Sequence, residues 1–356
     1  MKVLTVIGTR PNFVKAYLLS RQLRNRKHKE ILVHTGQHFD FEMSKIFFKD
    51  LNIPTPKYNL NLRGEAINQM LESIILIIKK EKPDLIMIYG DTNSSLAGAV
   101  AGHFCQIPVA HVEAGVRTYD LEMIEEKNRV IIDHFSSLLF CPTKNALNSL
   151  NKEGYGKKAY FSGDVMYDAV LDSKSKLQSQ EILKRYQLET KKYYVLTLHR
   201  QNSVDSKKSL MEILSAIKSK MPIVFPIHPR TRKNLTKFGL LDKYQQTVKI
   251  IPPLGYLDML SLVNDSKIVI TDSGGLQKEA FFLKVPCVVL LDKPGWIEIV
   301  RTGWNRVTGI NHNKIKKALS DFETTSLKTN LEQYFGDGQA VNKIVSVCEK
   351  YISNNQ

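Results

Sequence analysis

The feature that most constrains the fold of this chain is a regular alternation of short apolar segments with helical patterns. The apolar segments are rich in Val, Ile and Leu, which is typical of buried strands. Strands that alternate with helices form parallel sheets covered on both faces, so the sequence predicts an α/β fold. Helices are expected at 66–80, 125–137 and 275–284, among others. Strands are expected at 3–8, 31–35, 84–89, 109–113, 138–142, 159–163, 193–198, 223–227, 248–252, 267–271, 286–291 and 305–309.

The expected strands form two groups, which indicates two domains. The length of 356 residues agrees, because single hydrophobic cores stop growing at about 250–300 residues. We expect two Rossmann-like domains whose parallel sheets face a central cleft. The first spans 1–168 and the second 169–339, and a final helix within about 340–356 packs back on the first domain.

The net charge of the chain limits the classes of partner that it is expected to bind. Its 51 Lys and Arg residues against 35 Asp and Glu give a formal net charge of +16, which attracts anions. The lysines are scattered and no nucleic-acid-binding motif occurs, so we expect a nucleotide-sized anionic substrate and no nucleic acid. No apolar run approaches the roughly 20 residues of a membrane span, so we expect no membrane insertion. The cysteines lack C-x-x-C spacing, which suits a reducing cytoplasm.

Polar residues and glycines collect directly after the expected strands of both domains. Ligands of open α/β sheets bind at the carboxyl ends of strands, so these residues predict a functional cleft. They are Gly8 to Pro11, Gly36 to His38, Gly90 to Thr92, Glu113 to Gly115, His199 and Arg200, His228 to Arg230, and Asp272 to Gly275.

The stretch 109–129 contains the clearest candidates for chemistry. An apolar strand ends on the carboxylate of Glu113, and a second acidic pair, Glu125 and Glu126, follows the next loop. Paired carboxylates can act as general acid and base. Alternatively, Glu113 caps a turn and the acidic pair favours the N-terminus of a helix. The residues alone leave both interpretations open.

Further patterns predict phosphate binding. The run from Asp272 to Gly275 lies between a strand and a helix, and leaves backbone N–H groups available to phosphate. Arg10 and Lys15 can reach a phosphate near the start of the first helix, although Lys15 by itself is better explained as solvated charge. His199 and His228 each end a strand, where they can donate to phosphate. No histidine spacing typical of a metal site accompanies them, so we expect no metal.

Together, these motifs carry a family resemblance. The chain resembles the non-hydrolysing UDP-N-acetylglucosamine 2-epimerases over essentially its whole length, and the matching stretches occur in the family's order and spacing. They are GTRPNFVK (8–15), HTGQHFD (34–40), GDTNSSLAG (90–98), HVEAGVRT (111–118), EEKNR (125–129), GDVMYD (163–168), HPRT (228–231) and TDSGGLQKEA (271–280).

The resemblance implies GT-B-like domains that hold UDP, and a homodimer in the cytoplasm. It implies conversion of UDP-N-acetylglucosamine to UDP-N-acetylmannosamine for surface polysaccharide, with no metal or redox cofactor. In that reaction a base takes the C2 proton of the sugar while UDP leaves C1, which gives 2-acetamidoglucal and free UDP. UDP then adds back as a proton reaches the other face of C2.

The resemblance also implies roles for individual residues. Asp91, Glu113 and Glu125 are the acid–base candidates, and His199 assists the departing diphosphate. Glu279 binds the ribose. The implied substrate-binding residues are Arg10, Lys15, Gln37, His38, Arg117, Arg129, His228, Arg230, Ser273, Gly274, Gly275 and Glu279.

The chain departs from the family's pattern at several positions. Asn12 stands where Glu or Gln is usual, Ile124 replaces a proline, and Asn202 replaces a Glu. Leu291 falls where an arginine is common, and the loop at 62–66 is shortened. The loss of the arginine removes one expected cation from the cleft.

Three other hypotheses therefore remain beside that of a UDP-N-acetylglucosamine 2-epimerase. The same reaction can act on a related UDP-sugar such as UDP-2,3-diacetamido-2,3-dideoxyglucuronate, since 31–60 also resembles that subgroup and a basic cleft suits an acidic sugar. A GT-B glycosyltransferase shares the fold and the nucleotide end, but would not need Asp91, Glu113 and Glu125 together. A non-catalytic UDP-sugar binder is the third, motivated by Asn12 and the other departures.

Overall fold

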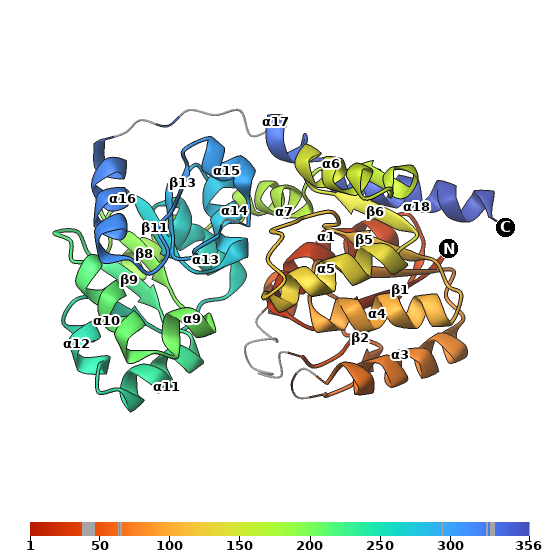
Figure 1. Ribbon diagram of the computed structural model, residues 1–356, viewed down its shortest axis with the longest axis horizontal. Coiled ribbons are helices and arrows are strands. Elements are labelled where there is room, and N and C mark those ends of the chain that lie inside the picture. Colours follow the sequence, from red (N-terminus) through yellow and green to blue (C-terminus); the bar gives the residue numbers. More distant parts are fainter. Residues whose placement is uncertain are drawn as a thin grey trace. The chain divides into compact units, whose positions relative to one another are not determined.

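The alternating segments fold into two parallel sheets, one in each of two units of the chain (Figure 1). The computed structural model describes residues 1–37, 47–62, 64, 66–293, 295–324, 327 and 332–355. The first unit comprises Met1–Leu171 with Asn330–Gln356, and the second comprises Asp172–Thr329. The α/β class predicted from the sequence is confirmed.

The sheet of the first unit has seven strands in the order β3-β2-β1-β4-β5-β6-β7, and every pairing is parallel. The short edge strand β3 was not expected, because two residues are too few to form an apolar pattern. The strands are β1 (Lys2–Ile7), β2 (Lys29–His34), β3 (Tyr58–Asn59), β4 (Leu85–Tyr89), β5 (Val109–Val112), β6 (Leu138–Cys141) and β7 (Ala159–Phe161).

Helices connect these strands. Three of them, α3, α4 and α5, lie side by side (Figure 1). The C-terminal helix α18 packs against α1, where Arg26 donates to Glu349 at 2.7 Å. The helices of this unit are α1 (Arg10–Asn25), α3 (Ile67–Glu81), α4 (Asn93–Phe104), α5 (Ile124–Phe135), α6 (Lys144–Lys152), α7 (Val165–Lys174, which runs into the second unit), α17 (Glu332–Phe335) and α18 (Ala340–Asn354).

The second unit has a six-stranded parallel sheet in the order β10-β9-β8-β11-β12-β13. Its strands are β8 (Tyr194–Thr197), β9 (Ile223–Pro226), β10 (Lys249–Ile251), β11 (Ile268–Thr271), β12 (Cys287–Val289) and β13 (Asn305–Val307). Its helices are α8 (Ser179–Arg185), α9 (Gln201–Val204), α10 (Lys207–Ala216), α11 (Pro229–Lys237), α12 (Leu241–Gln245), α13 (Tyr256–Asn264), α14 (Gly274–Phe282), α15 (Ile297–Arg301) and α16 (His312–Thr324). None of the described helices is long and apolar enough to cross a membrane.

Helix α4 packs closely on the first sheet because it carries two glycines one turn apart. A Cβ added at Gly98 would stand 2.8 Å from a side-chain carbon of Ile88, and one at Gly102 would stand 2.4 Å from a side-chain carbon of Val109. Both distances are far below van der Waals contact. The glycines therefore let the backbone of α4 approach β4 and β5. The start of α4 lies at the carboxyl edge of the sheet because the helix follows β4 after three residues.

Substituting Gly102→Val tests this close packing. The added side chain overfills a site bounded by Val109 and Ile86, so the free energy of unfolding of the first unit should fall by about 2 kcal/mol. Chemical denaturation measures the change. Glu72→Ala, an exposed position on α3, is the control and should stay within about 0.5 kcal/mol. Unchanged stability in Gly102→Val would contradict the packing described.

Candidate functional site

Two of the candidate carboxylates of the first unit lie at adjacent strand ends. Tyr89 of β4 is the register partner of Val112 of β5, and the amide of Gly90 donates to the Val112 carbonyl at 2.8 Å. Asp91 directly follows Gly90 in the sequence, and Glu113 directly follows Val112. Their neighbourhood thus comes from the parallel register, as the carboxyl-edge argument predicted.

Glu113 forms a nearly buried ion pair with Lys15. Lys15 Nζ lies 2.6 Å from Glu113 Oε1, and the two side chains are only 7% and 10% exposed. A Cβ at Gly90 would stand 2.6 Å from that ammonium, so the missing side chain makes room for the pair. Glu113 has φ 76°, a conformation that costs a non-glycine residue about 1–3 kcal/mol and clusters at functional sites.

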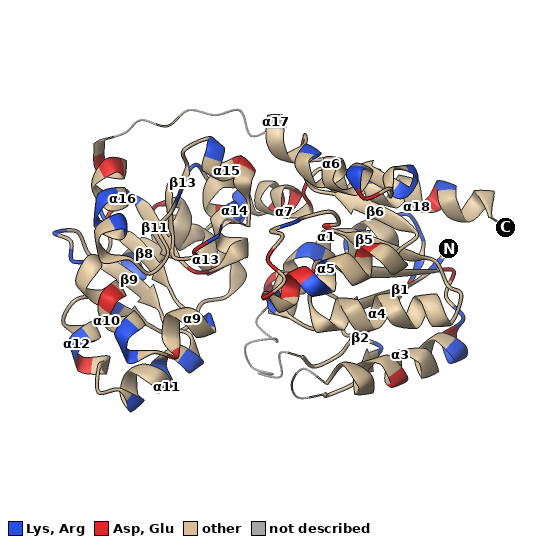
Figure 2. Ribbon diagram, viewed as in Figure 1, with Lys and Arg blue, Asp and Glu red and all other residues tan. Residues whose placement is uncertain are grey.

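Arg129 joins Asp91 to the acidic pair at the start of α5. Its guanidinium lies 2.5 Å from Asp91 Oδ2 and 2.8 Å from Glu126 Oε2. Figure 2 shows acidic and basic residues together at this end of the helix. Burial alone would lower the pKa of Arg129, but Asp91 and Glu126 outweigh it and raise the pKa, so Arg129 is a fixed cation.

Glu125 and Glu126 differ in their surroundings. Glu126 is almost fully buried and accepts hydrogen bonds from the Thr118 and Tyr119 amides, at 3.0 and 2.8 Å. Burial would raise the pKa of Glu126, but these amides and Arg129 together hold it below its ordinary value. Glu126 thus ties the loop after β5 to α5. Glu125 is partly buried and follows Ile124, one of the departures, which is exposed.

Arg117 lies inside the first unit. Its guanidinium contacts Asp133 at 2.8 Å and Glu153 at 2.7 Å, and its side chain is 2% exposed. Asp133 also lies 2.7 Å from Nδ1 of His111. The sequence patterns pointed to Arg117 but gave no role to His111 or Asp133. A usable signal was present, because an aspartate interrupts the apolar run of α5.

Asn12, another departure, is a fully buried link between β1 and β4. Its Oδ1 accepts from the amides of Gly8 and Thr9, both at 3.2 Å, and its Nδ2 donates to the Tyr89 carbonyl at 2.8 Å. An amide can accept and donate at once, which a carboxylate cannot. The amide therefore fits this position, which holds the start of α1 beside the end of β4.

The remaining candidates of this unit lie around the same edge. Gln37 accepts from the amide of Ser94 at 3.1 Å and from its hydroxyl at 2.7 Å, which places it at the start of α4. Arg10, at the start of α1, has its guanidinium 5.9 Å from the ring centroid of Phe47. His38 lies outside the described residues.

In the second unit, His199 is oriented by a buried carboxylate. Thr271 of β11 is the register partner of Thr197 of β8, so Asp272 stands next to the residues that follow β8. Asp272 accepts from the amides of His199 and Arg200, both at 2.9 Å, and lies 3.2 Å from Nδ1 of His199. Burial opposes its charge, but His199 and these amides hold the pKa of Asp272 below its ordinary value.

His228 and Arg230 begin α11. Nδ1 of His228 accepts from the Arg230 amide at 3.2 Å, so in a neutral ring the hydrogen is on Nε2. The side chain of Arg230 binds Asp205 through two nitrogens, at 3.0 and 2.5 Å. The rings of His199 and His228 lie 6.0 Å apart, so two imidazoles stand together at this edge of the second sheet.

The turn before α14 is built as the sequence pattern predicted. The Ser273 hydroxyl accepts from the amide of Leu276 at 3.3 Å, and Gly274 and Gly275 form the first turn. Glu279 lies farther along the helix and is largely buried. The sequence placed Arg200 among the expected cleft residues without a specific role, and its Nη2 stands 3.9 Å from where a Cβ of Gly274 would be. A cation thus lies beside this helix N-terminus.

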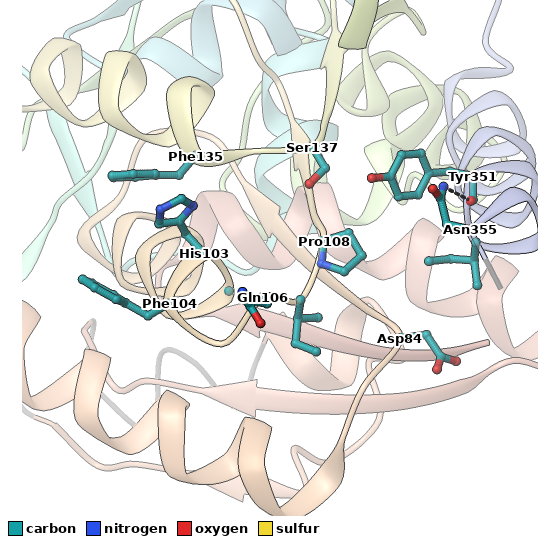
Figure 3. A pocket seen from close by; sticks show the side chains of 12 residues that line it. Asp84, His103, Phe104, Gln106, Pro108, Phe135, Ser137, Tyr351 and Asn355 are labelled. Carbon is teal, nitrogen blue, oxygen red and sulfur yellow. Dashed lines mark hydrogen bonds between the residues drawn. The ribbon is translucent and has the colours of Figure 1, made fainter.

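A hollow of about 680 Å³ in the first unit lies away from these groups (Figure 3). Its lining includes Asp84, Pro108 and Ser137, which precede β4, β5 and β6. The hollow is therefore at the amino ends of the strands, opposite Asp91 and Glu113, and we do not assign the chemistry to it. Among the described residues, no group of three or more His, Cys, Asp and Glu is placed to hold a metal ion.

Comparisons with known proteins agree with these motifs. The family model described as UDP-N-acetylglucosamine 2-epimerase matches residues 21–349. A Methanococcus maripaludis protein, named a UDP-N-acetylglucosamine 2-epimerase homolog, is 47% identical over 98% of this chain and 99% of its own. The UDP-2,3-diacetamido-2,3-dideoxy-D-glucuronate 2-epimerase of Pseudomonas aeruginosa is 40% identical over 98% of this chain and 100% of its own.

A solved structure is also similar. It is the Methanocaldococcus jannaschii UDP-GlcNAc 2-epimerase in complex with UDP-GlcNAc and UDP, with a TM-score of 0.91 and 39% identity. The match covers 98% of this chain and 100% of that one. The GT-B-like fold expected from the sequence is therefore confirmed.

Substituting Glu126→Gln tests how the loop after β5 is held. The amide keeps the shape but loses the charge and one acceptor, so at pH 7 the free energy of unfolding of the first unit should fall by about 2 kcal/mol. The folded pKa of Glu126 is below its ordinary value of 4.5. Its contribution is therefore complete above that value and is lost as the pH falls through the folded pKa.

Denaturation at pH 7 and at successively lower pH measures the difference between the wild type and Glu126→Gln. The difference should shrink below about pH 4.5. Glu122→Gln, an exposed position in the same loop, is the matched control and should change little at any pH. A difference that stays constant down to acid pH would rule out the charge as its source.

Proposed function

Because the chain belongs to the UDP-N-acetylglucosamine 2-epimerase family, we propose that it interconverts UDP-N-acetylglucosamine and UDP-N-acetylmannosamine. The C2 proton of the sugar is not next to a carbonyl, so its direct removal is very slow. Elimination avoids this difficulty. The C2–H electrons form a C1=C2 double bond, and UDP leaves C1 with the electrons of the C1–O bond. UDP then returns to C1 as a proton reaches the opposite face of C2.

We assign the proton transfers to the carboxylates of the first unit. Asp91 and Glu113 stand at adjacent strand ends, and Glu125 begins the helix that follows. Two faces of C2 require at least two groups that accept or donate protons. The observation that carries this assignment is the Lys15–Glu113 pair, because it fixes a carboxylate at the carboxyl edge of the sheet in a backbone conformation that clusters at functional sites.

We assign UDP to the second unit. The amides of Gly274 and Gly275 at the start of α14 favour a phosphate, and Glu279 suits the ribose hydroxyls. His199, held by Asp272 at 3.2 Å, presents its Nε2 to the departing diphosphate. Charge that develops on the leaving phosphate is stabilised by donors already in place.

Epimerisation of a UDP-sugar that carries other substituents is a second candidate function. The P. aeruginosa relative is named for an acidic diacetamido sugar and is 40% identical, and the M. jannaschii relative named for UDP-N-acetylglucosamine is 40% identical as well. The net charge of +16 suits either sugar nucleotide. We place UDP-N-acetylglucosamine first because the family model and the 47% identical relative both bear its name.

Incubation in deuterated water tests the reaction. With UDP-N-acetylglucosamine, NMR should show deuterium at C2 together with the manno isomer, and the diacetamido glucuronate sugar nucleotide should be compared in parallel. Glu113→Gln should slow exchange by about 10³-fold, which is typical for loss of a general base, while UDP binding stays within about twofold. Exposed Glu122→Gln is the control.

Two results would contradict this proposal. Absence of C2 exchange with both sugar nucleotides would refute the epimerase, and transfer of the sugar to an acceptor would favour a glycosyltransferase. Exchange near the wild-type rate in Glu113→Gln would remove Glu113 from the chemistry and leave the reaction itself standing.

We also propose that the enzyme is a homodimer in the cytoplasm, and that its product is destined for surface polysaccharide, as the family resemblance implies. The outer sides of α3, α4 and α5 supply an apolar surface for a second copy. Leu76 of α3 and Phe104 of α4 are 67% and 69% exposed, and Val130 and Ile131 of α5 are also exposed. Such exposed groups gather at interfaces between proteins.

Leu76→Glu combined with Ile131→Glu tests this surface. Two buried charges without partners should weaken the dimer by at least about 100-fold, and sedimentation velocity measures the shift to monomer. Met211→Glu, an exposed apolar position on α10 of the second unit, is the control and should leave the dimer intact. A monomeric wild type at micromolar concentration would refute the dimer.

A further inference from the structure

A buried cluster of charged side chains lies among the elements that end at Asp91 and Glu113. His111 on β5 and Asp133 on α5 are both fully buried. Nδ1 of His111 lies 2.7 Å from Asp133 Oδ1, and Arg117 lies 2.8 Å from Asp133 Oδ2. Burying such charges is costly unless every one is paired. The proposed reaction uses none of these three side chains directly.

His111 and Asp133 bind the backbone beside both candidate carboxylates, Asp91 and Glu113. Nε2 of His111 lies 2.9 Å from the carbonyl oxygen of Gly90, the residue before Asp91. Asp133 Oδ2 accepts from the amide of Gly115, two residues after Glu113, at 3.1 Å. The His111–Asp133 pair therefore connects the β4–α4 turn with the β5–α5 loop and fixes them relative to each other.

The ring of His111 faces an acceptor on each side, since a carboxylate and a carbonyl oxygen cannot donate. Its bond to the Gly90 carbonyl therefore requires hydrogen on Nε2. Asp133 pairs with Arg117 as well. Burial alone would raise the pKa of Asp133, but His111 and Arg117 hold it below its ordinary value.

The backbone at Glu113 needs such support. Glu113 has φ 76°, and a strained non-glycine residue keeps its conformation only when the surroundings enforce it. Proton transfer depends steeply on placement, because a displacement of about 1 Å can cost about 100-fold in rate.

We propose that His111 and Asp133 are positioning residues, which hold Asp91 and Glu113 at the separation that the two proton transfers at C2 require. They act through the Gly90 carbonyl and the Gly115 amide and do not touch the substrate. The inference rests on the proposed function of Asp91 and Glu113. It gives a role to two residues, His111 and Asp133, to which the sequence motifs assigned none.

His111→Asn in the full chain tests the proposal. The shorter side chain gives up the bond to Gly90, while Asp133 keeps Arg117 and the Gly115 amide, so no buried charge loses all its partners. The kcat for the UDP-sugar should fall by about 100-fold, while KM and UDP binding stay within about twofold. His134→Gln removes an exposed histidine from α5, the helix that carries Asp133, and should leave kcat unchanged.

A folded His111→Asn variant with kcat within about threefold of the wild type would overturn the proposal. If that variant does not fold, ¹⁵N NMR of the wild-type His111 ring decides. Hydrogen on Nε2 of the ring in the folded enzyme supports the proposal, and an Nε2 without hydrogen overturns it. A wild type that turns over neither UDP-sugar refutes the proposed function instead, so the two failures are distinguishable.

Discussion

The backbone hydrogen bonds of the parallel sheets set the position of every candidate group within each unit. Because Tyr89 pairs with Val112, and Thr271 pairs with Thr197, polar residues that follow these strands meet at one edge. The side chains that stand there then depend on close packing behind them. Gly98 and Gly102 bring α4 against the sheet, and Asn12 holds the start of α1 beside β4.

Charge pairing is the second constraint on the first unit. Lys15 contacts Glu113, Arg129 contacts Asp91, and Arg117 contacts Asp133. Each of these cations is largely buried, and a buried charge is tolerated only with a partner. The same pairs that stabilise the unit therefore also orient the carboxylates. The net charge of +16 is a sum over the whole chain, and says little about this edge.

Much of the fold and part of the candidate site could be predicted. The alternation of apolar segments and helices gave the α/β class, and the residues after each strand gave Asp91, Glu113 and Asp272 as neighbours of other polar groups. The partners could not be predicted in the same way. Asp133 lies 22 residues from His111 and Lys15 lies 98 residues from Glu113, and no local pattern reports such pairs.

By itself, the sequence determined the order of the elements, the family, and which residue types follow each strand, because these depend on local periodicity and on motifs. Only the tertiary structure decided what each side chain does. Arg117 is bound to Asp133 and Glu153, Glu126 holds a loop, and Arg200 stands beside Gly274. The reason is physical: a charged side chain takes its role from the partners that folding brings to it from distant parts of the chain.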